Sequence, residues 1–459
     1  MECLIPRVVI AATKSGSGKT TIVTGLLAAL KQKGVKVQPY KVGPDYIDPG
    51  YHKLASGQPS HNLDSWLMSM DTMVEVFANS ASKAELAVIE GVMGLYDGGR
   101  KGISSTAEIA KSLDAPVVLV LDCKSMGASA AALALGFKMY DKDVKLAGVI
   151  LNRLGSDNHE KIIRDALEEL DIPVLGAVRR NDSLVMPERH LGLLPVEENQ
   201  EQEIINRMGE AMASQIDVDE IIRIGKSAGA MKVQDKEIND NGKSKVRIGI
   251  ARDEAFSFYY PESIRVLEKK GAEIIEFSPL SDDELPQVDG LIFGGGFPEM
   301  FAEKLSANKA LIEGIKGAAH DGMPIYAECG GFMFLSRAME DFEGRVFPMC
   351  DILPCRVKMN SRLQMVGYVS AELQTDGILG KKGDVIKGHE FHFSTEDAED
   401  GNTVAKRAFK FTRSRNGSQY FGGYSNGNVL GSYLHLHFAG YPQAADSFIE
   451  KCVEYKRKK

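Results

Sequence analysis

The stretch Thr13-Lys-Ser-Gly-Ser-Gly-Lys-Thr20 decides the fold of the first half of this chain. It follows an apolar run at 7–12 with the composition of a buried strand, and it precedes residues 21–30, whose apolar residues recur at helical spacing. A strand, a glycine-rich turn ending in Lys-Thr and a helix form the setting of a phosphate-binding loop, because backbone N–H groups and the helix N-terminus cradle phosphates. These flanks disfavour the alternative, a glycine-rich turn without a ligand.

The spacing of the basic residues in this loop is unusual. The first glycine of the standard motif would fall at Thr13, and a second lysine, Lys14, stands two residues before Gly16. This spacing resembles the variant loop of dethiobiotin synthetase-like and partition-type ATPases. We expect the lysines to neutralise phosphate charge and the hydroxyl of Thr20 to bind Mg²⁺. The expected ATP-binding residues of the loop are Lys14, Gly16, Gly18, Lys19, Thr20 and Thr21.

Length and composition exclude several classes of protein. A chain of 459 residues predicts about two or three domains. The net charge of −8 argues against general nucleic-acid binding, which needs a basic surface. The six cysteines are scattered without metal-ligand spacing, as in a reducing cytosol. No run reaches the ~20 apolar residues of a membrane helix, and the N-terminus lacks a signal-peptide pattern. We therefore expect a cytoplasmic protein with neither nucleic acid nor membrane as a partner.

The chain divides into two α/β halves. Residues 1–225 alternate strand-like and helix-like segments, which predicts a mostly parallel sheet with helices on both faces. Residues 226–245 are small, polar and charged without apolar periodicity, so we expect a linker there. A new strand at 246–251 opens a second α/β domain at 246–459. The expected strands of the first half are 7–12, 35–40, 86–90, 116–122, 146–151 and 173–178.

The second half carries a candidate nucleophile, Cys329. The segment 323–335 is typical of a strand, a sharp turn and a helix, and small residues, Ala327 and Gly331, stand two positions to either side of the cysteine. A nucleophile elbow needs small neighbours because its turn is tight. The positive end of the following helix is expected to favour the thiolate. The alternative is a buried structural cysteine.

Two further segments are expected to complete a site around Cys329. The glycine run 294–296 follows a strand-like segment, and we expect backbone N–H groups at Gly295, Gly296 and Gly330 to stabilise an oxyanion; a plain turn is the alternative. Residues 430–438 contain His435 and His437, which would share one face if the segment is a strand. Either imidazole could then act as the base that deprotonates Cys329.

These motifs resemble known families. Cys329 in Ala-Glu-Cys-Gly-Gly, the 294–296 glycine run and His435 resemble the triad-type glutamine amidotransferases. Four longer segments resemble the cobyrinate a,c-diamide synthase family, and they lie at 41–49, 89–97, 388–392 and 431–437. The resemblance covers both halves. It implies a dethiobiotin synthetase-like ATP-binding domain at 1–225 fused to an α/β glutamine amidotransferase domain at 246–459.

The resemblance also implies the chemistry. The first domain would transfer the ATP γ-phosphoryl group to a substrate carboxylate, and ammonia released from glutamine by Cys329 and His435 would displace phosphate. The implied partners are ATP, L-glutamine and a tetrapyrrole polycarboxylic acid, with Mg²⁺ as cofactor and a homodimer as an open possibility. Amidotransferases usually carry Glu two residues after the catalytic His, but His437 stands there, so the third member of the site stays open. The roles of His389 and His392 also stay open.

Acidic and amide residues of the first half complete the candidate site. Glu90, at the end of the 86–90 strand, and Asp48 are expected to bind Mg²⁺ with Thr20, a solvated surface carboxylate being the alternative for each. Further candidates are Asp45 and Tyr46, which would face the tetrapyrrole or Mg²⁺, Asp97, which would orient substrate or phosphate, and Asn152, which would read the adenine edge or cap a loop.

Two other functions stay open from the sequence. The same a,c-diamidation could act on nickel sirohydrochlorin, on the route to the nickel coenzyme of methanogenesis, because that macrocycle bears equivalent acetate groups. A partition-type ATPase switch is permitted by the loop but leaves the Cys329 domain without a role. The related cobyrate synthase also joins these domain types, but the segments 41–49 and 388–392 fit the diamide enzyme better.

Overall fold

The computed structural model describes residues 2–99, 102–181, 198–233, 246–398 and 406–459. It separates into two compact units, Met1–Ser65 with Ser69–Lys236, and Trp66–Met68 with Glu237–Lys459. The expected linker is structured at its beginning, because β9 (Met231–Lys232) pairs antiparallel with β1 (Glu2–Cys3) in the first unit. The part of that linker at 234–245 lies outside the described residues.

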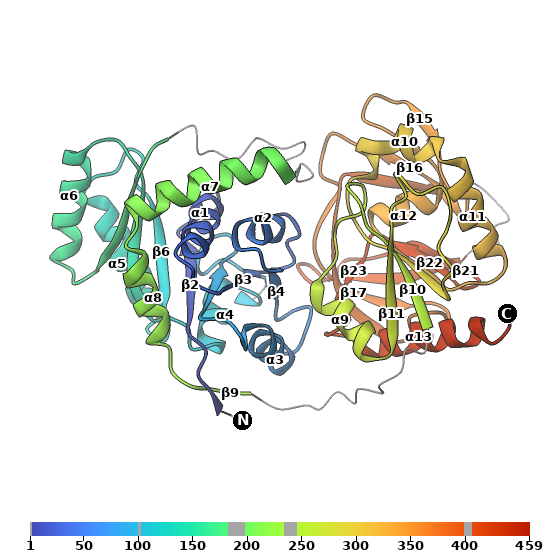
Figure 1. Ribbon diagram of the computed structural model, residues 1–459, viewed down its shortest axis with the longest axis horizontal. Coiled ribbons are helices and arrows are strands. Elements are labelled where there is room, and N and C mark those ends of the chain that lie inside the picture. The colour runs from blue at the N-terminus through green and yellow to red at the C-terminus, as the bar shows by residue number, and fades with distance from the viewer. Residues whose placement is uncertain (1, 100–101, 182–197, 234–245, 399–405) are drawn as a thin grey trace. The chain divides into compact units, whose positions relative to one another are not determined.

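A seven-stranded sheet forms the centre of the first unit (Figure 1). Its order is β4-β3-β5-β2-β6-β7-β8, and all of its neighbouring strands are parallel, which confirms the expected sheet. The short strand β4 was not expected. The strands are β2 (Arg7–Ala12), β3 (Val37–Val42), β4 (His61–Leu63), β5 (Leu86–Glu90), β6 (Val117–Asp122), β7 (Leu146–Leu154) and β8 (Val174–Arg179).

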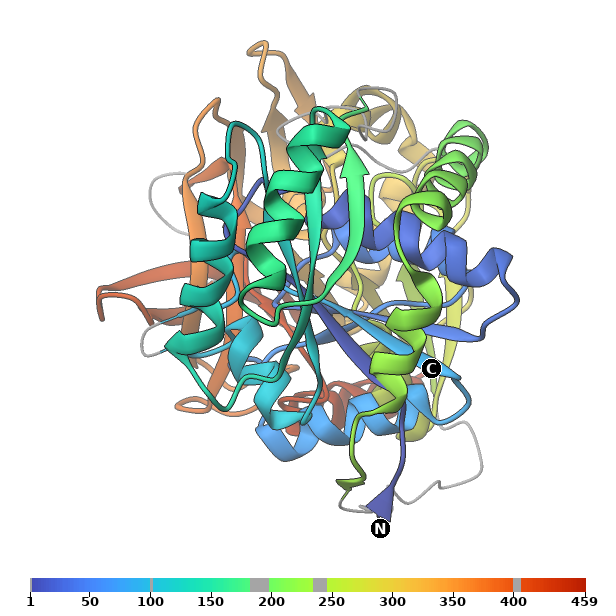
Figure 2. The same cartoon turned by 90° about the vertical axis from the view of Figure 1, so that its left-hand side faces the viewer.

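Helices cover this sheet on both faces. Apolar residues of α1, α7 and α8 share one core with Val8 and Ile10, the residues of β2 that point to that face. Figure 2 shows the green helices α7 and α8 on one side of the strands and the teal helix α5 on the other. The helices are α1 (Lys19–Gln32), α2 (Ile47–Ser56), α3 (Met70–Ala81), α4 (Thr106–Ser112), α5 (Ser129–Tyr140), α6 (Asp157–Glu168), α7 (Glu198–Gln215) and α8 (Val218–Lys226).

The second unit is built on a ten-stranded mixed sheet of order β11-β10-β12-β13-β22-β21-β20-β17-β18-β23. Strands from β11 to β22 are parallel and the remaining neighbours are antiparallel, an extension that the sequence analysis did not anticipate. Its strands are β10 (Val246–Ala251), β11 (Ala272–Phe277), β12 (Gly290–Phe293), β13 (Ile325–Glu328), β17 (Met365–Leu373), β18 (Val385–His392), β20 (Lys406–Arg413), β21 (Gln419–Asn426), β22 (Val429–Ser432) and β23 (His435–Leu436).

Shorter elements complete this unit. A four-stranded sheet consists of β15 (Val346–Pro348), β14 (Ser336–Glu340), β16 (Leu353–Met359) and β19 (Ser394–Ala398). The helices are α9 (Pro261–Lys269), the 3₁₀ turn η4 (Pro298–Phe301), α10 (Ala302–Ala307), α11 (Lys309–His320), α12 (Gly330–Leu335) and α13 (Pro442–Lys456). Among the described residues, we find no helix with the length and apolar character needed to cross a membrane.

Candidate active sites

The phosphate-binding loop joins the buried strand β2 to α1, as the sequence predicts. Gly18 caps α1 with φ 81°, a left-handed conformation that favours glycine. A Cβ at Gly18 would also overlap the side-chain amide of Asn152. That amide donates to the Ser17 carbonyl at 2.8 Å, so Asn152 holds the loop itself. This contact fits the loop-capping role, one of the two alternatives for this residue.

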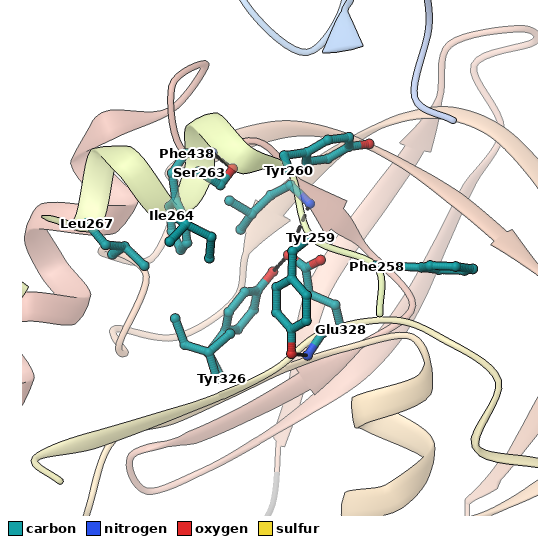
Figure 3. Close-up of a pocket in the computed structure, with 12 residues that line it drawn as sticks. Phe258, Tyr259, Tyr260, Ser263, Ile264, Leu267, Tyr326, Glu328 and Phe438 are labelled. Carbon is teal, nitrogen blue, oxygen red and sulfur yellow. Dashed lines mark hydrogen bonds between the residues drawn. The ribbon is translucent and has the colours of Figure 1, made fainter. Parts of the chain in front are cut away.

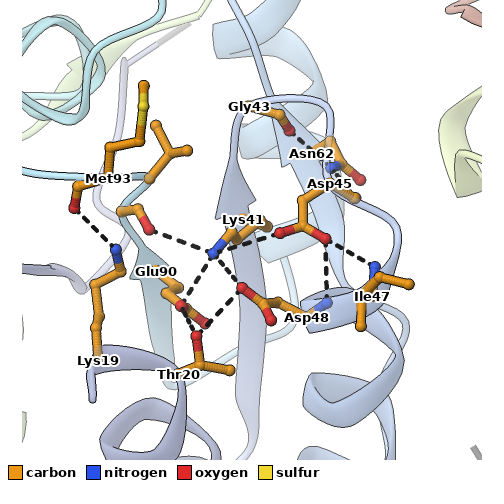
Figure 4. A network of polar contacts seen from close by, with 12 residues as sticks. Lys19, Thr20, Lys41, Gly43, Asp45, Ile47, Asp48, Asn62, Glu90 and Met93 are labelled. Atoms are coloured by element: carbon orange, nitrogen blue, oxygen red, sulfur yellow. Dashed lines mark hydrogen bonds and ion pairs between the residues drawn. The ribbon is translucent and has the colours of Figure 1, made fainter. Parts of the chain in front are cut away.

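Three candidate residues converge at the carboxyl ends of β3 and β5. The hydroxyl of Thr20 donates to Glu90 Oε1 at 2.8 Å and lies 3.3 Å from Asp48 Oδ2 (Figure 4). Glu90 is completely buried, so it is not the solvated surface carboxylate of the alternative interpretation. A hydroxyl and two carboxylates are oxygen donors that suit Mg²⁺.

Lys41, at the end of β3, occupies the centre of this cluster (Figure 4). Its ammonium Nζ lies 2.5 Å from Asp48 Oδ2, 3.0 Å from Glu90 Oε1 and 3.8 Å from Asp45 Oδ2. The residue had no predicted role, although it opens the 41–49 segment that carries the family resemblance. A buried cation among three carboxylates offsets part of their negative charge.

His52 is a second residue that the sequence analysis missed. Its Nε2 lies 2.6 Å from Glu90 Oε2, and its Nδ1 lies 3.1 Å from the hydroxyl of Ser60. The side chain is completely buried. Both oxygens of Glu90 therefore have partners, which fixes the direction in which the carboxylate faces Thr20.

The remaining predicted residues of this half lie on loops at the same edge of the sheet. Asp45 Oδ1 accepts hydrogen bonds from the N–H groups of Ile47 and Asp48 at the start of α2, and Tyr46 is the residue that caps this helix. Asp97 Oδ2 accepts from the Gly94 N–H at 3.0 Å and closes the turn after β5. The carboxylates of Asp45 and Asp97 therefore accept hydrogen bonds from the backbone of their own loops.

Burial and neighbouring charged side chains shift the pKa values of three residues in this cluster. Burial raises the pKa of Asp48 to about 6, helped by Asp45 and opposed by Lys41. Burial alone would raise the pKa of Glu90, but Lys41 and the hydrogen bond from His52 outweigh it and hold the pKa below its usual value. Burial, with the nearby charge of Lys41, lowers the pKa of Lys19 to about 8.

The second site forms around Cys329, between β13 and α12. The backbone of Cys329 has φ 45° and ψ −100°, a left-handed conformation that is strained for a residue with a side chain. Its N–H donates to the Ser432 carbonyl at 2.8 Å, and the Gly331 N–H donates to the Gly294 carbonyl at 2.9 Å. This strand, strained residue and helix have the geometry of the predicted nucleophile elbow.

We expect Gly331→Ala to destabilise the second unit by about 1–3 kcal/mol, because an added Cβ would overlap the Phe293 carbonyl group in a packed core. Thermal unfolding measures this change. The matched control is Gly317→Ala on α11, where an added Cβ meets nothing within 4 Å and helix propensity favours alanine. An unchanged unfolding temperature for Gly331→Ala would refute the steric requirement.

The structure brings the predicted oxyanion glycines to the elbow. A Cβ at Gly330 would lie 3.0 Å from the Gly296 nitrogen, and a Cβ at Gly295 would lie 2.7 Å from Cε1 of His435. The glycine run after β12 is therefore adjacent both to the residue after Cys329 and to the imidazole. This arrangement can place backbone N–H groups and a base around one acyl group.

Burial opposes the predicted thiolate at Cys329. Burial raises the pKa of the thiol well above its usual value, the carboxylates of Glu299 and Glu328 raise it further, and a backbone hydrogen bond at Gly330 lowers it only in part. The short helix α12 does not overcome these effects. Burial therefore favours the neutral thiol at Cys329, and a base beside the sulfur would promote formation of the thiolate.

Two further histidines of this unit, His389 and His392, lie on β18. His389 stacks on His435 with ring centroids 4.9 Å apart, and His392 stacks on Tyr433 at 3.8 Å. His437 would share a face with His435 only if the segment were one strand, and that condition is not met. The strand β23 ends at Leu436, because the His437 carbonyl accepts the N–H of Gly440 at 2.8 Å and closes a turn.

A third residue without a predicted role is Glu328, directly before the nucleophile. Its Oε2 lies 3.4 Å from Nδ1 of His435. Glu328 is part of the Ala-Glu-Cys-Gly-Gly motif that marks the nucleophile. The motif alone does not reveal its contact with His435, because the two residues are more than a hundred positions apart in the chain.

Comparisons with known proteins match a family to each half of the chain. Residues 8–194 match the CobQ/CobB/MinD/ParA nucleotide binding domain family, and residues 247–443 match the CobB/CobQ-like glutamine amidotransferase domain family. The chain is 46% identical over 455 residues to a protein of Dehalococcoides mccartyi (strain CBDB1) named cobyrinate a,c-diamide synthase, covering 97% of each chain. A protein of Leptospira interrogans with the same name is 41% identical over 456 residues, covering 99% of this chain and 100% of its own length.

Proposed function

This chain belongs to the cobyrinate a,c-diamide synthase family, and we propose that it uses ATP and glutamine to convert the a and c acetate carboxylates of cobyrinate into amides in cobalamin biosynthesis. One observation carries the proposal: a single chain holds the predicted phosphate-binding loop beside the carboxylates of Asp48 and Glu90, and a separate elbow at Cys329 whose preceding residue, Glu328, contacts His435. The first arrangement suits activation of a carboxylate and the second suits release of ammonia.

Activation is required because a carboxylate has no adequate leaving group for attack by ammonia. In the proposed first step, a substrate carboxylate oxygen attacks the γ-phosphorus of ATP, and the bond to the ADP oxygen breaks. Ammonia then attacks the acyl carbon, phosphate leaves and the surplus proton is lost. Positioning and charge neutralisation supply most of such catalysis. Lys14, Lys19 and Lys41 are the cations that would neutralise the phosphates.

The residues around Thr20 fit a bound Mg²⁺. Its hydroxyl and the carboxylates of Asp48 and Glu90 already meet within hydrogen-bond distance, and His52 keeps Glu90 oriented. When bound, the cation would neutralise charge on the phosphate oxygens of ATP. Asp45, Tyr46 and Asp97 would face the tetrapyrrole substrate from adjoining loops.

Glutamine would be hydrolysed at Cys329. The thiol proton passes to His435 while sulfur attacks the side-chain amide carbon, with the oxyanion received by N–H groups at Gly295, Gly296 and Gly330. His435 returns the proton to the departing nitrogen, which leaves as ammonia. Water then cleaves the thioester, releasing glutamate and restoring the thiol.

The direct test is mass spectrometry of the products formed from cobyrinic acid with ATP, Mg²⁺ and glutamine. We expect two exchanges of OH for NH₂ and no third. Nickel sirohydrochlorin as the substrate in a parallel reaction tests the alternative, since it carries equivalent acetate groups. If only the nickel macrocycle were amidated, nickel sirohydrochlorin would be the substrate in place of cobyrinate. If neither reaction gave an amide product, the proposal would be refuted.

We expect Glu90→Gln to raise the Mg²⁺ concentration needed for half-maximal amidation by about tenfold or more, which corresponds to about 1.4 kcal/mol. The amide keeps the size of the side chain but removes the charge beside Thr20. The measurement is a Mg²⁺ titration of ammonia-dependent amidation. Glu160→Gln is the control, because that carboxylate pairs with Arg164 and Arg179 on another part of the unit. An unchanged titration for Glu90→Gln would remove this residue from the metal site.

A further inference from the structure

Glu328 is held from two sides. Its Oε1 accepts a hydrogen bond from the Tyr326 hydroxyl at 2.7 Å and another from the Leu436 N–H at 3.3 Å. Tyr326 stands two residues earlier on β13, so both side chains project from the same face of the strand. Figure 3 shows the Tyr326 hydroxyl directed at Glu328 in a small pocket that Tyr259 and Tyr260 also line. The carboxylate has little freedom to rotate.

Its second oxygen faces the imidazole of His435. Oε2 lies 3.4 Å from Nδ1, and the two side chains are 11% and 3% exposed. The Cε1 atom of the same ring is directed toward the glycine run, since a Cβ at Gly295 would approach it to 2.7 Å. The imidazole therefore lies between a fixed carboxylate on its Nδ1 side and the presumed oxyanion glycines.

The other titratable groups around His435 do not supply this function. His389 stacks on the ring, and His392 lies on the same strand, β18. Burial lowers the pKa of both, and the charge of His435 lowers it further. Glu390 follows His389, but its carboxylate turns to Tyr420. Glu328 is thus the carboxylate that lies within ion-pair distance of His435 among the described residues.

We propose that Glu328 is the positioning residue of the Cys329–His435 site: its carboxylate receives the Nδ1–H of His435, so that Nε2 is the atom that exchanges protons with Cys329 and the leaving ammonia. The inference rests on the proposed roles of Cys329 and His435. A carboxylate beside Nδ1 fixes the tautomer and stabilises the imidazolium formed when Cys329 gives up its proton. In this role Glu328 forms no bond to the substrate.

This assignment explains how the site works without a carboxylate two residues after the histidine. His437 occupies that position, but its ring packs 4.8 Å from that of Tyr260 and its Nδ1 accepts the Ala439 N–H. The carboxylate is supplied instead by the residue before the nucleophile, at the end of β13. This strand pairs parallel with β22, which ends at Ser432, three residues before His435.

Glu328→Gln tests the proposal. The amide can still accept from Tyr326, but it cannot stabilise an imidazolium. We expect kcat for glutamine-dependent amidation to fall roughly 100-fold, with the KM for glutamine nearly unchanged and the ammonia-dependent rate retained. The acid limb of the glutamine pH–rate profile should move to lower pH, because removal of a neighbouring carboxylate makes any imidazole harder to protonate. Glu328→Asp should restore part of the rate.

Two controls separate this inference from its premises and from a structural role. Glu390→Gln removes another buried carboxylate that accepts from a tyrosine, Tyr420, and should leave the acid limb in place. Glutamine activity that survives Cys329→Ser would refute the premise. If Cys329→Ser is inactive but Glu328→Gln keeps its rate and pH profile, only the positioning role is wrong. Loss of ammonia-dependent activity in both Glu328 variants would show a structural role and also overturn it.

Discussion

Lys19→Ala is expected to lower amidation at least about 1000-fold with glutamine and with ammonia alike, a loss of about 4 kcal/mol in transition-state stabilisation. Lys19 opens α1 directly after the left-handed Gly18, and its ammonium donates to the Met93 carbonyl at 3.2 Å on the loop that follows Glu90. A charge at that point faces any phosphate bound by the loop. In the proposed mechanism both nitrogen sources depend on the same phosphorylated intermediate, so neither would bypass the loss.

Lys33→Ala is the matched control, because Lys33 lies just beyond the other end of α1 and pairs with the exposed Asp219. That variant should keep its full rate. If Lys19→Ala retained more than about a tenth of the wild-type rate, a loss below about 1.4 kcal/mol, the phosphate role would be wrong.

Lys19 also predicts a pH dependence of nucleotide binding. Its pKa is lowered to about 8, mainly by burial, so the side chain loses its charge as the pH rises through that value. Phosphate binds the protonated form, and binding above this pH must therefore include uptake of a proton. The Kd for ATP should be flat on the acid side of the pKa and rise on the alkaline side, whereas Lys19→Ala should lack this rise. Calorimetry in buffers of different ionisation enthalpy measures the proton uptake.

The features that the sequence predicted well are those set by local sterics. Gly18 and Gly331 each stand where a side chain would overlap a neighbour, and each belongs to a short contiguous motif between a strand and a helix. The geometry of such a motif can be predicted from the sequence, because a tight turn accepts only small residues at certain positions. The parallel sheet of the first unit followed from the same reasoning, since its strands are buried on both faces and contain mostly apolar residues.

The features that the sequence did not predict depend on contacts between distant segments. The positions of three residues became meaningful only when the structure showed their partners on other elements: Lys41 and His52 contact Glu90, and Glu328 contacts His435. The helix that begins after Cys329 is visible in the sequence, but the burial that raises the pKa of its thiol depends on the whole core. The strand β23 ends before a turn that is closed by the hydrogen bond from the Gly440 N–H to the His437 carbonyl. The pattern of apolar residues in the sequence does not indicate such a hydrogen bond.

Cys329→Ser is expected to abolish glutamine-dependent amidation and to leave ammonia-dependent amidation within about twofold of the wild-type rate. The hydroxyl replaces the thiol with little change in volume, so the strained elbow and its contacts with Ser432 and Gly294 can persist. Ammonia supplied at high concentration reaches the phosphorylated carboxylate without the thioester route. The rescue should strengthen as pH rises, because only unprotonated ammonia is a nucleophile.

His435→Asn should show the same division between the two nitrogen sources, since the imidazole serves only the proton transfers at Cys329. The paired assays of both variants, with unfolding temperature as a control, therefore distinguish the site that makes ammonia from the site that consumes it. A folded Cys329→Ser protein that lost both activities would contradict that separation. Full glutamine activity in this variant would be more serious, because the nucleophile would then have to be a residue other than the one at the elbow.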